Sequence, residues 1–459
     1  MDYKLSKVKR KEYDQTRSRS MRKYVCHAPL SSMYIGIGGM ITSCCVNRTY
    51  LLGNYPENSL EESWFGERRM ALAKAMKRGD LSKGCEVCYH SIVGGNTSGN
   101  SARAYDKFAE QRHKYPAKID FELSNRCNLE CIICRGERSS SIRKNREKLP
   151  PIQTPFDDAF IQELDPFLPH LKETQFLGGE PFLIPIYLDI WERMAAVNPS
   201  IHVRVQTNAT ILTDRVKKIL ESMRFSISIS IDAVNKELYE EVRINGKFDT
   251  VSENIKYYQD YCLRKNTTLS ISYTPMIRNW HELPDSVRFC NERGIRLFYN
   301  TLTHPSYLAI GKRPTEEIQR IYNFLSSKTF PVESQLEIEN KAASDDFVRL
   351  VHHWLEMSSA SAKATLPAYA SMDEFFDSFR AYLKKEQVQN VNDMYVNVRG
   401  KIESLLTIAE DQLLYDEATN FILGLDFAKI QRYVPNASLE ELRTGFMQEV
   451  DQSPRHQHG

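Results

Sequence analysis

The 459-residue sequence has no long apolar run, which argues against a membrane-spanning helix, because such a helix needs about 18 uninterrupted apolar residues. Its basic N-terminus, with Lys4, Lys7 and Lys11, lacks the apolar stretch that completes a secretory signal peptide. The formal net charge is only +2, so charge gives no argument for a nucleic-acid partner. We therefore expect a cytoplasmic protein that uses neither a membrane nor a nucleic acid.

Cysteine is also scarce. The chain has ten cysteines, far below the roughly 8 to 10% typical of a disulfide scaffold. Eight of the ten fall into two groups, one between residues 26 and 88 and one between residues 127 and 134. Thiolate metal ligands require a reducing compartment. The cysteine pattern therefore predicts a cytoplasmic metalloprotein.

The second group, Cys127, Cys131 and Cys134, has the spacing CxxxCxxC. Three thiolates this close in a loop can hold three irons of a cubane 4Fe-4S cluster and leave the fourth iron without a protein ligand. A structural zinc site is the alternative, but zinc sites close with four protein ligands, usually as two separated pairs. The spacing favours a cluster with one iron open to chemistry.

Strand-like runs with one polar face surround this loop. Residues 118–123, 202–208, 225–232 and 269–274 read as strands, and in the last three apolar and polar residues alternate along the run. Helical segments lie between them, such as the one that begins at a Thr213 cap. An antiparallel sheet with one solvated face would show the same alternation but not the intervening helices. The pattern predicts an α/β fold with a curved sheet, helices outside and a polar cofactor on the concave side.

A second motif, Gly178, Gly179, Glu180 and Pro181, follows the next predicted strand after the cysteine loop. Together with CxxxCxxC it resembles the radical S-adenosylmethionine (SAM) superfamily. That resemblance implies a partial (β/α)6 TIM-like barrel in which Cys127, Cys131 and Cys134 hold the catalytic cluster. SAM would chelate the open iron, be cleaved reductively, and yield a 5′-deoxyadenosyl radical that abstracts hydrogen from a substrate. Gly178 to Pro181 would bind the amino group of the SAM methionine, the glycines by close backbone approach and Glu180 as an acceptor.

Four further residues resemble SAM contacts of the family by placement. Asn208, Ser230 and Asp232 lie on the polar faces of the third and fourth strands, where the family has ribose contacts, and Arg243 is a fork donor suited to the SAM carboxylate. Each of them alone also fits an ordinary surface or helix-end group. One departure is visible, because Ile133 stands before the last cysteine where the family usually has an aromatic residue. This weakens the expected adenine pocket but not cluster ligation.

The N-terminal cysteines resemble the first half of the pattern of SPASM and twitch domains, CX(9–15)GX4C, which hold auxiliary 4Fe-4S clusters. Twelve residues separate Cys26 from Gly39, four more precede Cys44, and Cys85 and Cys88 form a CxxC pair. Cys26, Cys44, Cys85 and Cys88 would saturate one cluster, with Cys45 either spare or the true ligand in place of Cys44. Such domains usually follow the radical core, whereas here the cysteines precede it. A zinc ribbon is the competing interpretation.

Length and pattern indicate three regions: an auxiliary-cluster domain over residues 1–115, a radical core over 116–311 and a helical region over 312–459. In the last region, apolar stripes at helical spacing begin at Phe347 and at Phe375. The two remaining thiols, Cys262 and Cys290, lie in helical patterns and are expected to act as small apolar residues, with a hydrogen-atom donor as the alternative.

The leading functional hypothesis is a radical SAM enzyme acting on a ribosomally made peptide by crosslinking, oxidation or epimerisation, since families with such auxiliary domains often do. Radical dehydrogenation or rearrangement of a small molecule, such as a sugar or an amine, is the second hypothesis. A non-enzymatic cluster or zinc protein is the third. The resemblance also implies an external electron donor such as flavodoxin or ferredoxin.

Overall fold

The structure is a computed structural model that describes residues 3–96, 99–110, 114–363, 371–386, 388–406, 422, 427–439 and 442. The chain divides into two compact units. The first unit comprises Met1–Tyr273 with Asp285–Phe298 and Ser334–Asn340, and it contains all of the predicted site residues. The second unit comprises Thr274–Pro284, Tyr299–Glu333 and Lys341–Gly459.

One nine-stranded sheet organises the first unit, in the order β3-β2-β1-β4-β5-β6-β7-β8-β9. Neighbouring strands from β1 through β4 to β8 run parallel, whereas β2 and β3 are antiparallel additions at the N-terminal edge. The four strands predicted from the sequence are all present, and they are β4, β6, β7 and β8. The strand bounds are β1 Ser32–Gly36, β2 Met40–Thr42, β3 Gly53–Asn54, β4 Lys118–Glu122, β5 Glu173–Phe176, β6 His202–Thr207, β7 Arg224–Ser230, β8 Leu269–Tyr273 and β9 Arg296–Tyr299.

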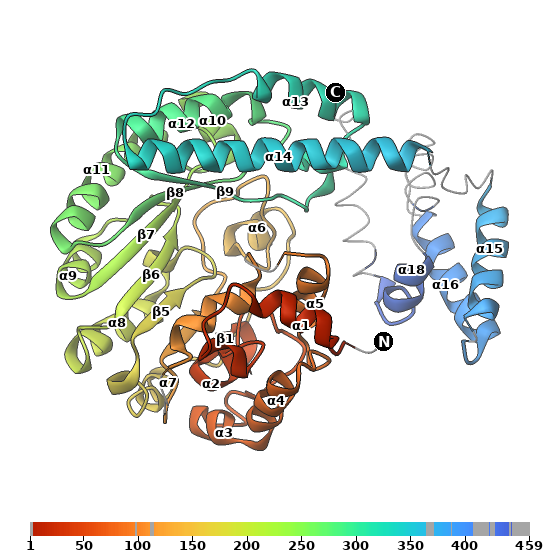
Figure 1. The fold of residues 1–459 in the computed structure, drawn as a ribbon, viewed down its shortest axis with the longest axis horizontal. Helices are drawn as coiled ribbons and strands as arrows, with labels where there is room; N and C mark the ends of the chain where they lie inside the picture. Colours follow the sequence, from red (N-terminus) through yellow and green to blue (C-terminus); the bar gives the residue numbers. More distant parts are fainter. Residues whose placement is uncertain are drawn as a thin grey trace. The chain divides into compact units, whose positions relative to one another are not determined.

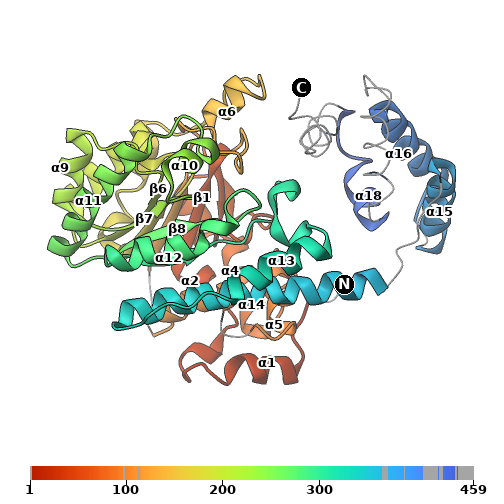
Figure 2. The ribbon, with the colours of Figure 1, turned by 90° about the horizontal axis from the view of Figure 1, so that it is seen from above.

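Helices connect the parallel strands, and α8, α9 and α11 lie on the outer side of the curved sheet (Figure 1; Figure 2). Helix α9 begins after Thr213, whose Oγ1 accepts a hydrogen bond from the Val216 amide at 3.3 Å, so the predicted cap is present. The helix bounds are α1 Lys7–Asp14, α2 Ala28–Ser31, α3 Leu60–Phe65, α4 Glu67–Arg78, α5 Glu86–Val93, α6 Ser140–Asn145, α7 Asp158–Glu163, α8 Pro185–Val197, α9 Asp214–Ser222, α10 Lys236–Val242, α11 Phe248–Lys265, α12 Leu283–Glu292, α13 Thr315–Ser326, α14 Gln335–Lys363, α15 Met372–Lys385, α16 Val391–Leu406 and α18 Phe427–Tyr433.

Aromatic side chains join the outer face of the sheet to helix α8. Phe121 of β4 stacks on Phe176 of β5 at 4.8 Å between ring centroids. Trp191 of α8 meets Phe176 edge-on at 4.9 Å and Phe225 of β7 at 5.3 Å. All four side chains are fully buried, so this aromatic layer forms part of the core between the sheet and α8.

The other face of the same strands is polar, as the alternation predicted. The Gln206 side-chain amide on β6 donates to the hydroxyl of Ser230 on β7 at 3.0 Å and lies 3.4 Å from the Ser272 hydroxyl on β8. Parallel strands with helices on one face and polar side chains on the other confirm the predicted partial TIM-like barrel.

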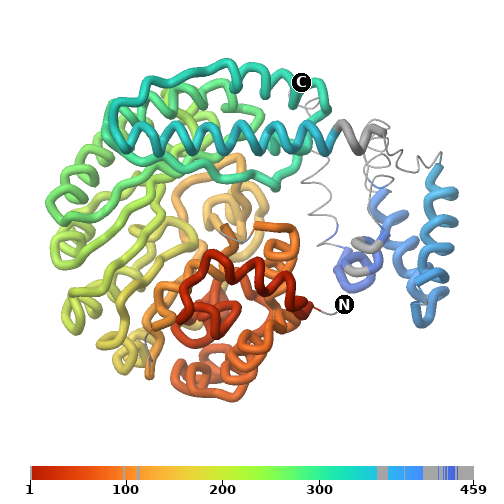
Figure 3. The backbone as a smooth tube through the Cα atoms, viewed as in Figure 1, coloured from red at the N-terminus to blue at the C-terminus, as the bar shows by residue number. Residues whose placement is uncertain are grey.

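The N-terminal cysteine region shares the sheet of the core. Strand β1 pairs in parallel with β4, with Tyr34 opposite Asp120 and Gly36 opposite Glu122. The backbone trace shows this region, coloured red to orange, directly beside the yellow strands (Figure 3). The sequence prediction treated residues 1–115 as a region of its own and did not foresee this shared sheet.

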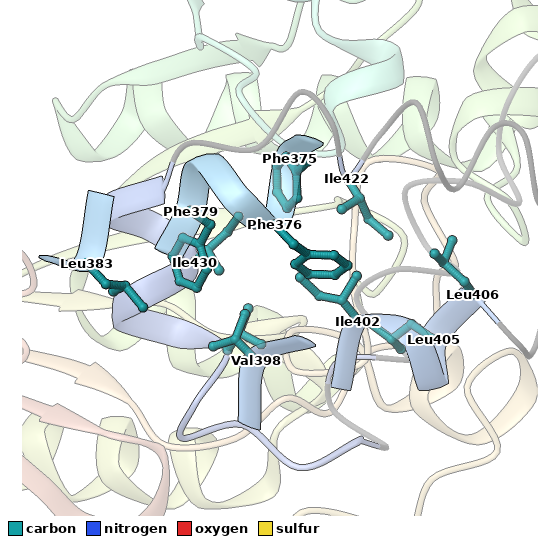
Figure 4. Packing of buried hydrophobic residues seen from close by; sticks show 11 residues of the cluster. Phe375, Phe376, Phe379, Leu383, Val398, Ile402, Leu405, Leu406, Ile422 and Ile430 are labelled. Atoms are coloured by element: carbon teal, nitrogen blue, oxygen red, sulfur yellow. The ribbon is translucent and has the colours of Figure 1, made fainter. Parts of the chain in front are cut away.

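The second unit is helical. In α14, Phe347, Val351 and Leu355 are buried at the predicted helical spacing. A separate apolar cluster forms where α15, α16 and α18 pack together (Figure 4). Phe375 and Phe379 of α15 belong to that cluster, so both predicted stripes are core.

Candidate functional site

The loop that carries Cys127 to Cys134 leaves the carboxyl end of β4 and is held on one side by the segment after β5. The Gly179 amide donates to the Ser124 carbonyl at 3.0 Å, and the Glu180 amide donates to the Arg126 carbonyl at 2.8 Å. These bonds continue the β4–β5 pairing past the ends of both strands. The two motifs recognised in the sequence are therefore in direct backbone contact.

The segment after α10 holds the same loop on its other side. The Glu130 amide donates to the Ile244 carbonyl and the Ile132 amide to the Val242 carbonyl, both at 3.0 Å. Backbone hydrogen bonds therefore hold the cysteine loop from both sides.

The paired glycines serve this packing. Gly178 has φ +112°, and a Cβ atom there would lie 2.4 Å from the Ser124 carbonyl oxygen. A Cβ atom on Gly179 would lie 2.2 Å from the Arg126 carbonyl oxygen. The sequence analysis expected the glycines to admit a ligand, whereas the structure shows them admitting the backbone of the cysteine loop.

Replacing Gly179 by alanine is expected to displace the cysteine loop, at a cost of about 1–3 kcal/mol for overpacking a tight contact. The midpoint of chemical denaturation should fall, and iron bound after anaerobic reconstitution should fall with it. Gly400→Ala is the matched control, because Gly400, like Gly179, does not have a left-handed φ, and nothing lies within 4 Å of its Cβ position. Equal iron contents in the two variants would show that Gly179 does not position the loop.

The three thiols of the loop influence one another. Burial raises the pKa of Cys127 to about 11 and that of Cys134 to about 12, and neighbouring thiols add to both effects. Burial also raises the pKa of Cys131, against the opposing effect of Arg243. Metal ligation at this loop would displace the thiol protons, because the thiolate is the ligand.

Glu180 points into the protein. One carboxylate oxygen accepts from the Phe182 amide at 3.1 Å and the Thr207 hydroxyl at 2.7 Å, and the other accepts from the Asn208 amide at 2.7 Å. Burial raises the pKa of Glu180 to about 7, although these three donors favour the charged form. The side chain ties the end of β5 to the end of β6, a role that sequence reasoning missed.

Asn208 extends this connection to the cysteine loop. Its side-chain amide donates to the Asn128 side-chain oxygen at 3.1 Å and lies 3.9 Å from the Cys127 sulfur. Ser230 lies farther along the polar face, where its hydroxyl accepts from Gln206. Asn208 is thus placed beside the cysteine loop, while Ser230 belongs to the barrel lining.

Asp232 and Arg243 form an ion pair with each other. Arg243 Nη2 lies 2.7 Å from Asp232 Oδ2, and both side chains are buried. Arg243 Nη1 also lies 3.9 Å from the Cys131 sulfur. The sequence analysis assigned these residues to different parts of SAM, but the structure pairs the two buried charges with each other.

The N-terminal cysteines meet around an apolar cavity. Cys26, Cys44, Cys85 and Cys88 all line it, together with Tyr105. Cys45 does not line this cavity, so of the adjacent pair the structure favours Cys44. The Cys45 carbonyl instead accepts from Arg48 Nε at 2.9 Å.

Amide donors already point at the cavity sulfurs. The Ala28 amide lies 3.4 Å from the Cys26 sulfur. The backbone amide of Asn47 lies 3.4 Å from the Cys44 sulfur, and its side-chain amide lies 3.4 Å from the Cys85 sulfur. Hydrogen bonds to thiolate sulfur are a recurrent feature of iron–sulfur sites. Sequence reasoning missed Asn47, since nothing in the spacing marks it.

Within the described residues, no three His, Cys, Asp or Glu side chains converge on a position for a single metal ion. The donor set of both sites is nevertheless that of an iron–sulfur centre: clustered thiols, largely buried, with amide donors beside the sulfurs. The two remaining thiols, Cys262 and Cys290, are 3% and 0% exposed in α11 and α12, in agreement with the apolar role expected of them.

Comparison with known families gives the same two regions. Residues 121–290 match the family described as the radical SAM superfamily, and residues 26–89 match SPASM, an iron-sulfur cluster-binding domain. The chain therefore contains a radical SAM domain. This radical SAM protein carries its SPASM domain ahead of the core, as predicted, and the cofactors of the two domains are SAM and 4Fe-4S clusters.

Curated relatives are similar over part of their length. The chain is 26% identical over 189 residues to the probable GTP 3′,8-cyclase of Methanocaldococcus jannaschii, which is 41% of this chain and 58% of that protein. It is 25% identical over 280 residues to the AdoMet-dependent heme synthase of Methanosarcina barkeri, which is 60% of this chain and 67% of that protein. The chain thus spans about three fifths of the M. jannaschii protein and two thirds of the M. barkeri protein.

Among solved structures, Streptococcus suis SuiB bound to its precursor peptide SuiA is similar with a TM-score of 0.32 and 15% identity, covering 56% of this chain and 59% of that one. Native anSMEcpe with bound AdoMet is similar with a TM-score of 0.36 and 17% identity, covering 46% and 61%. In the described part of this radical SAM protein, no helix is long and apolar enough to cross a membrane.

Proposed function

We propose that this radical SAM enzyme modifies a ribosomally made peptide, with Cys127, Cys131 and Cys134 holding the catalytic 4Fe-4S cluster. The observation that carries the catalytic assignment is the cysteine loop itself, fixed between Gly179–Glu180 and Val242–Ile244 at the polar end of the barrel. When bound there, the cluster and SAM supply a carbon-centred radical that removes a hydrogen atom from the substrate.

The chain's own groups prepare this site in separate ways. Glu180 holds Asn208 against the cysteine loop through the Asn208 amide, and Asn208 and the Gly178–Pro181 segment together form the SAM-binding edge. The buried Arg243 guanidinium lies beside Cys131 and favours its thiolate form. The three protonated thiols release their protons when iron binds.

The peptide substrate is supported by the SPASM domain, because families with such auxiliary domains often act on ribosomally made peptides. The polar barrel lining of Gln206, Ser230 and Ser272 suits a polar substrate backbone. A small-molecule substrate is the second candidate, supported by the similarity to GTP 3′,8-cyclases. Either reaction needs an external one-electron donor of the flavodoxin or ferredoxin type.

Anaerobic reconstitution followed by addition of SAM and a reductant tests the proposal. We expect 5′-deoxyadenosine to form, and a peptide encoded beside the gene to change mass when it is added. Turnover of GTP in place of any peptide would select the small-molecule candidate. Failure of the reconstituted protein to cleave SAM under any of these conditions would contradict both.

Glu180→Gln is expected to weaken SAM binding and to lower stability. Both carboxylate oxygens accept from backbone amides, so the amide group of glutamine must place a donor against a donor. Hydrogen bonds to charged groups are worth about 1.5–3 kcal/mol, so stability should fall by about that amount, and displacement of the Asn208 segment should weaken SAM binding. Equilibrium binding of SAM to the reconstituted protein measures the effect.

Glu163→Gln is the control for this substitution. Among the described residues, Glu163 accepts from one backbone amide, that of Leu60, at 2.8 Å, and the glutamine oxygen can replace the carboxylate oxygen there. SAM affinity should be unchanged in this variant. Unchanged affinity in both variants would show that Glu180 does not shape the SAM-binding edge.

A further inference from the structure

Glu122, the last residue of β4, collects donors from three separate segments. Its side chain is 3% exposed. One oxygen accepts from the Tyr34 hydroxyl on β1 and from Arg48 Nη2, the latter at 2.8 Å, and the other oxygen pairs with Arg138 Nη1. Arg48 comes from the SPASM region and Arg138 from the loop just after the third cysteine, so one buried carboxylate joins two guanidinium groups from distant parts of the sequence.

This arrangement has an excess of positive charge. Two guanidiniums share one carboxylate, which leaves one positive charge in excess within the cluster. Burial and the nearby Arg48 both lower the pKa of Arg138, which reflects the proximity of the two cations. The side chains of Arg48 and Arg138 are 39% and 45% exposed, so the excess charge lies on the accessible side of the buried Glu122.

Both arginines also keep unused donors. A guanidinium has five N–H groups. Arg48 uses Nη2 on Glu122 and Nε on the Cys45 carbonyl, while Arg138 uses Nη1 on Glu122. The remaining N–H groups have no protein acceptor among the described residues. The guanidinium carbon of Arg48 also lies over the Tyr34 ring, 5.1 Å from the ring centroid. This contact restricts the orientation of the guanidinium group and of its remaining N–H groups.

We propose that Arg48 and Arg138 form a carboxylate-binding site for an acidic side chain of the substrate. The inference rests on the proposed peptide-modifying function and names a recognition element for it. Arg48 follows Cys44 by four residues and Arg138 follows Cys134 by four, which sets the site between the two cysteine groups at the end of β4. A guanidinium fork matches a carboxylate geometrically, and the single excess charge matches one carboxylate rather than a polyphosphate.

The experiment uses the wild-type chain, reconstituted anaerobically, and the arginine reagent phenylglyoxal. The probes are the peptide N-acetyl-Gly-Glu-Gly-amide, its glutamine counterpart, and GTP. With the glutamate peptide at roughly ten times its Kd, modification of Arg48 and Arg138 should slow by about tenfold, as mass action requires. Mass spectrometry of proteolytic fragments measures each arginine separately. The glutamine peptide should give no protection.

Arg193 is the internal control, because its side chain is 46% exposed and already paired with Asp165. Its modification rate should not respond to any probe. If Arg48 and Arg138 are modified at the same rates with the glutamate peptide as with the glutamine peptide, the proposal is overturned. The two arginines would then serve only to compensate the charge of Glu122. Protection by GTP alone would overturn it in favour of a phosphate site. None of these rate measurements requires SAM cleavage. The 5′-deoxyadenosine assay therefore tests the proposed enzymatic function separately from this binding site.

Discussion

The variant with Cys127, Cys131 and Cys134 all replaced by alanine is expected to form no detectable 5′-deoxyadenosine. The three sulfurs are the only cysteines in the loop between β4 and α6, and they influence one another's ionisation. Removing them removes every protein ligand of the proposed catalytic cluster, and the iron that would bind SAM is lost with it. Chromatographic detection of 5′-deoxyadenosine after reduction with dithionite measures the loss.

Cys262→Ala is the control, because it removes a buried thiol from α11 without touching the loop. That variant should cleave SAM, apart from any loss caused by lower stability. Cleavage at the wild-type rate in the triple variant would end the assignment of the catalytic cluster to this loop.

Secondary structure could be predicted from the sequence where a single local pattern determines the element. Strict alternation in residues 225–232 gave β7 with its apolar face on Trp191, and the Thr213 cap fixed the start of α9. The two SAM motifs were found for the same reason, since each is a short contiguous run. That the runs lie in contact follows from the parallel pairing of β4 with β5.

Long-range pairing could not be read in this way. The partners of Glu180 and Asn208 lie as many as 80 residues apart in sequence, and only the fold shows that Glu180 faces three protein donors. Asp232 and Arg243 each looked suited to a ligand because nothing in the sequence indicates their mutual ion pair. The same limit hid Glu122, whose arginine partners come from both sides of β4 in the sequence.

The choice between Cys44 and Cys45 shows the limit most clearly. The two residues are adjacent and chemically identical, so spacing fits both. The structure distinguishes them by position. The chain after β2 places Cys44 in the lining of the cavity with Cys26, Cys85 and Cys88, whereas Cys45 lies outside that lining.

That adjacency gives a sharp test of the auxiliary site. In the variant that lacks Cys127, Cys131 and Cys134, we expect about four irons per chain and a reducible EPR signal, because the two ligand sets share no residue. Adding Cys44→Ala should remove most of that iron, since three thiols remain at the cavity. Adding Cys45→Ala instead should leave it in place. The two variants differ by one position, so general effects of losing a thiol cancel between them.

Zinc would give a different result in the same proteins. The triple variant would then be colourless after anaerobic purification and contain stoichiometric zinc without iron, because zinc has no redox chemistry and no visible absorption of this kind. Such a result would refute the auxiliary cluster and leave the catalytic loop untouched. Equal iron loss on substituting either Cys44 or Cys45 would show instead that the cavity lining does not identify the ligand. Iron that is lost with Cys44 but not with Cys45 would establish an iron–sulfur centre at the cavity, which can exchange electrons. A zinc site could only stabilise the fold.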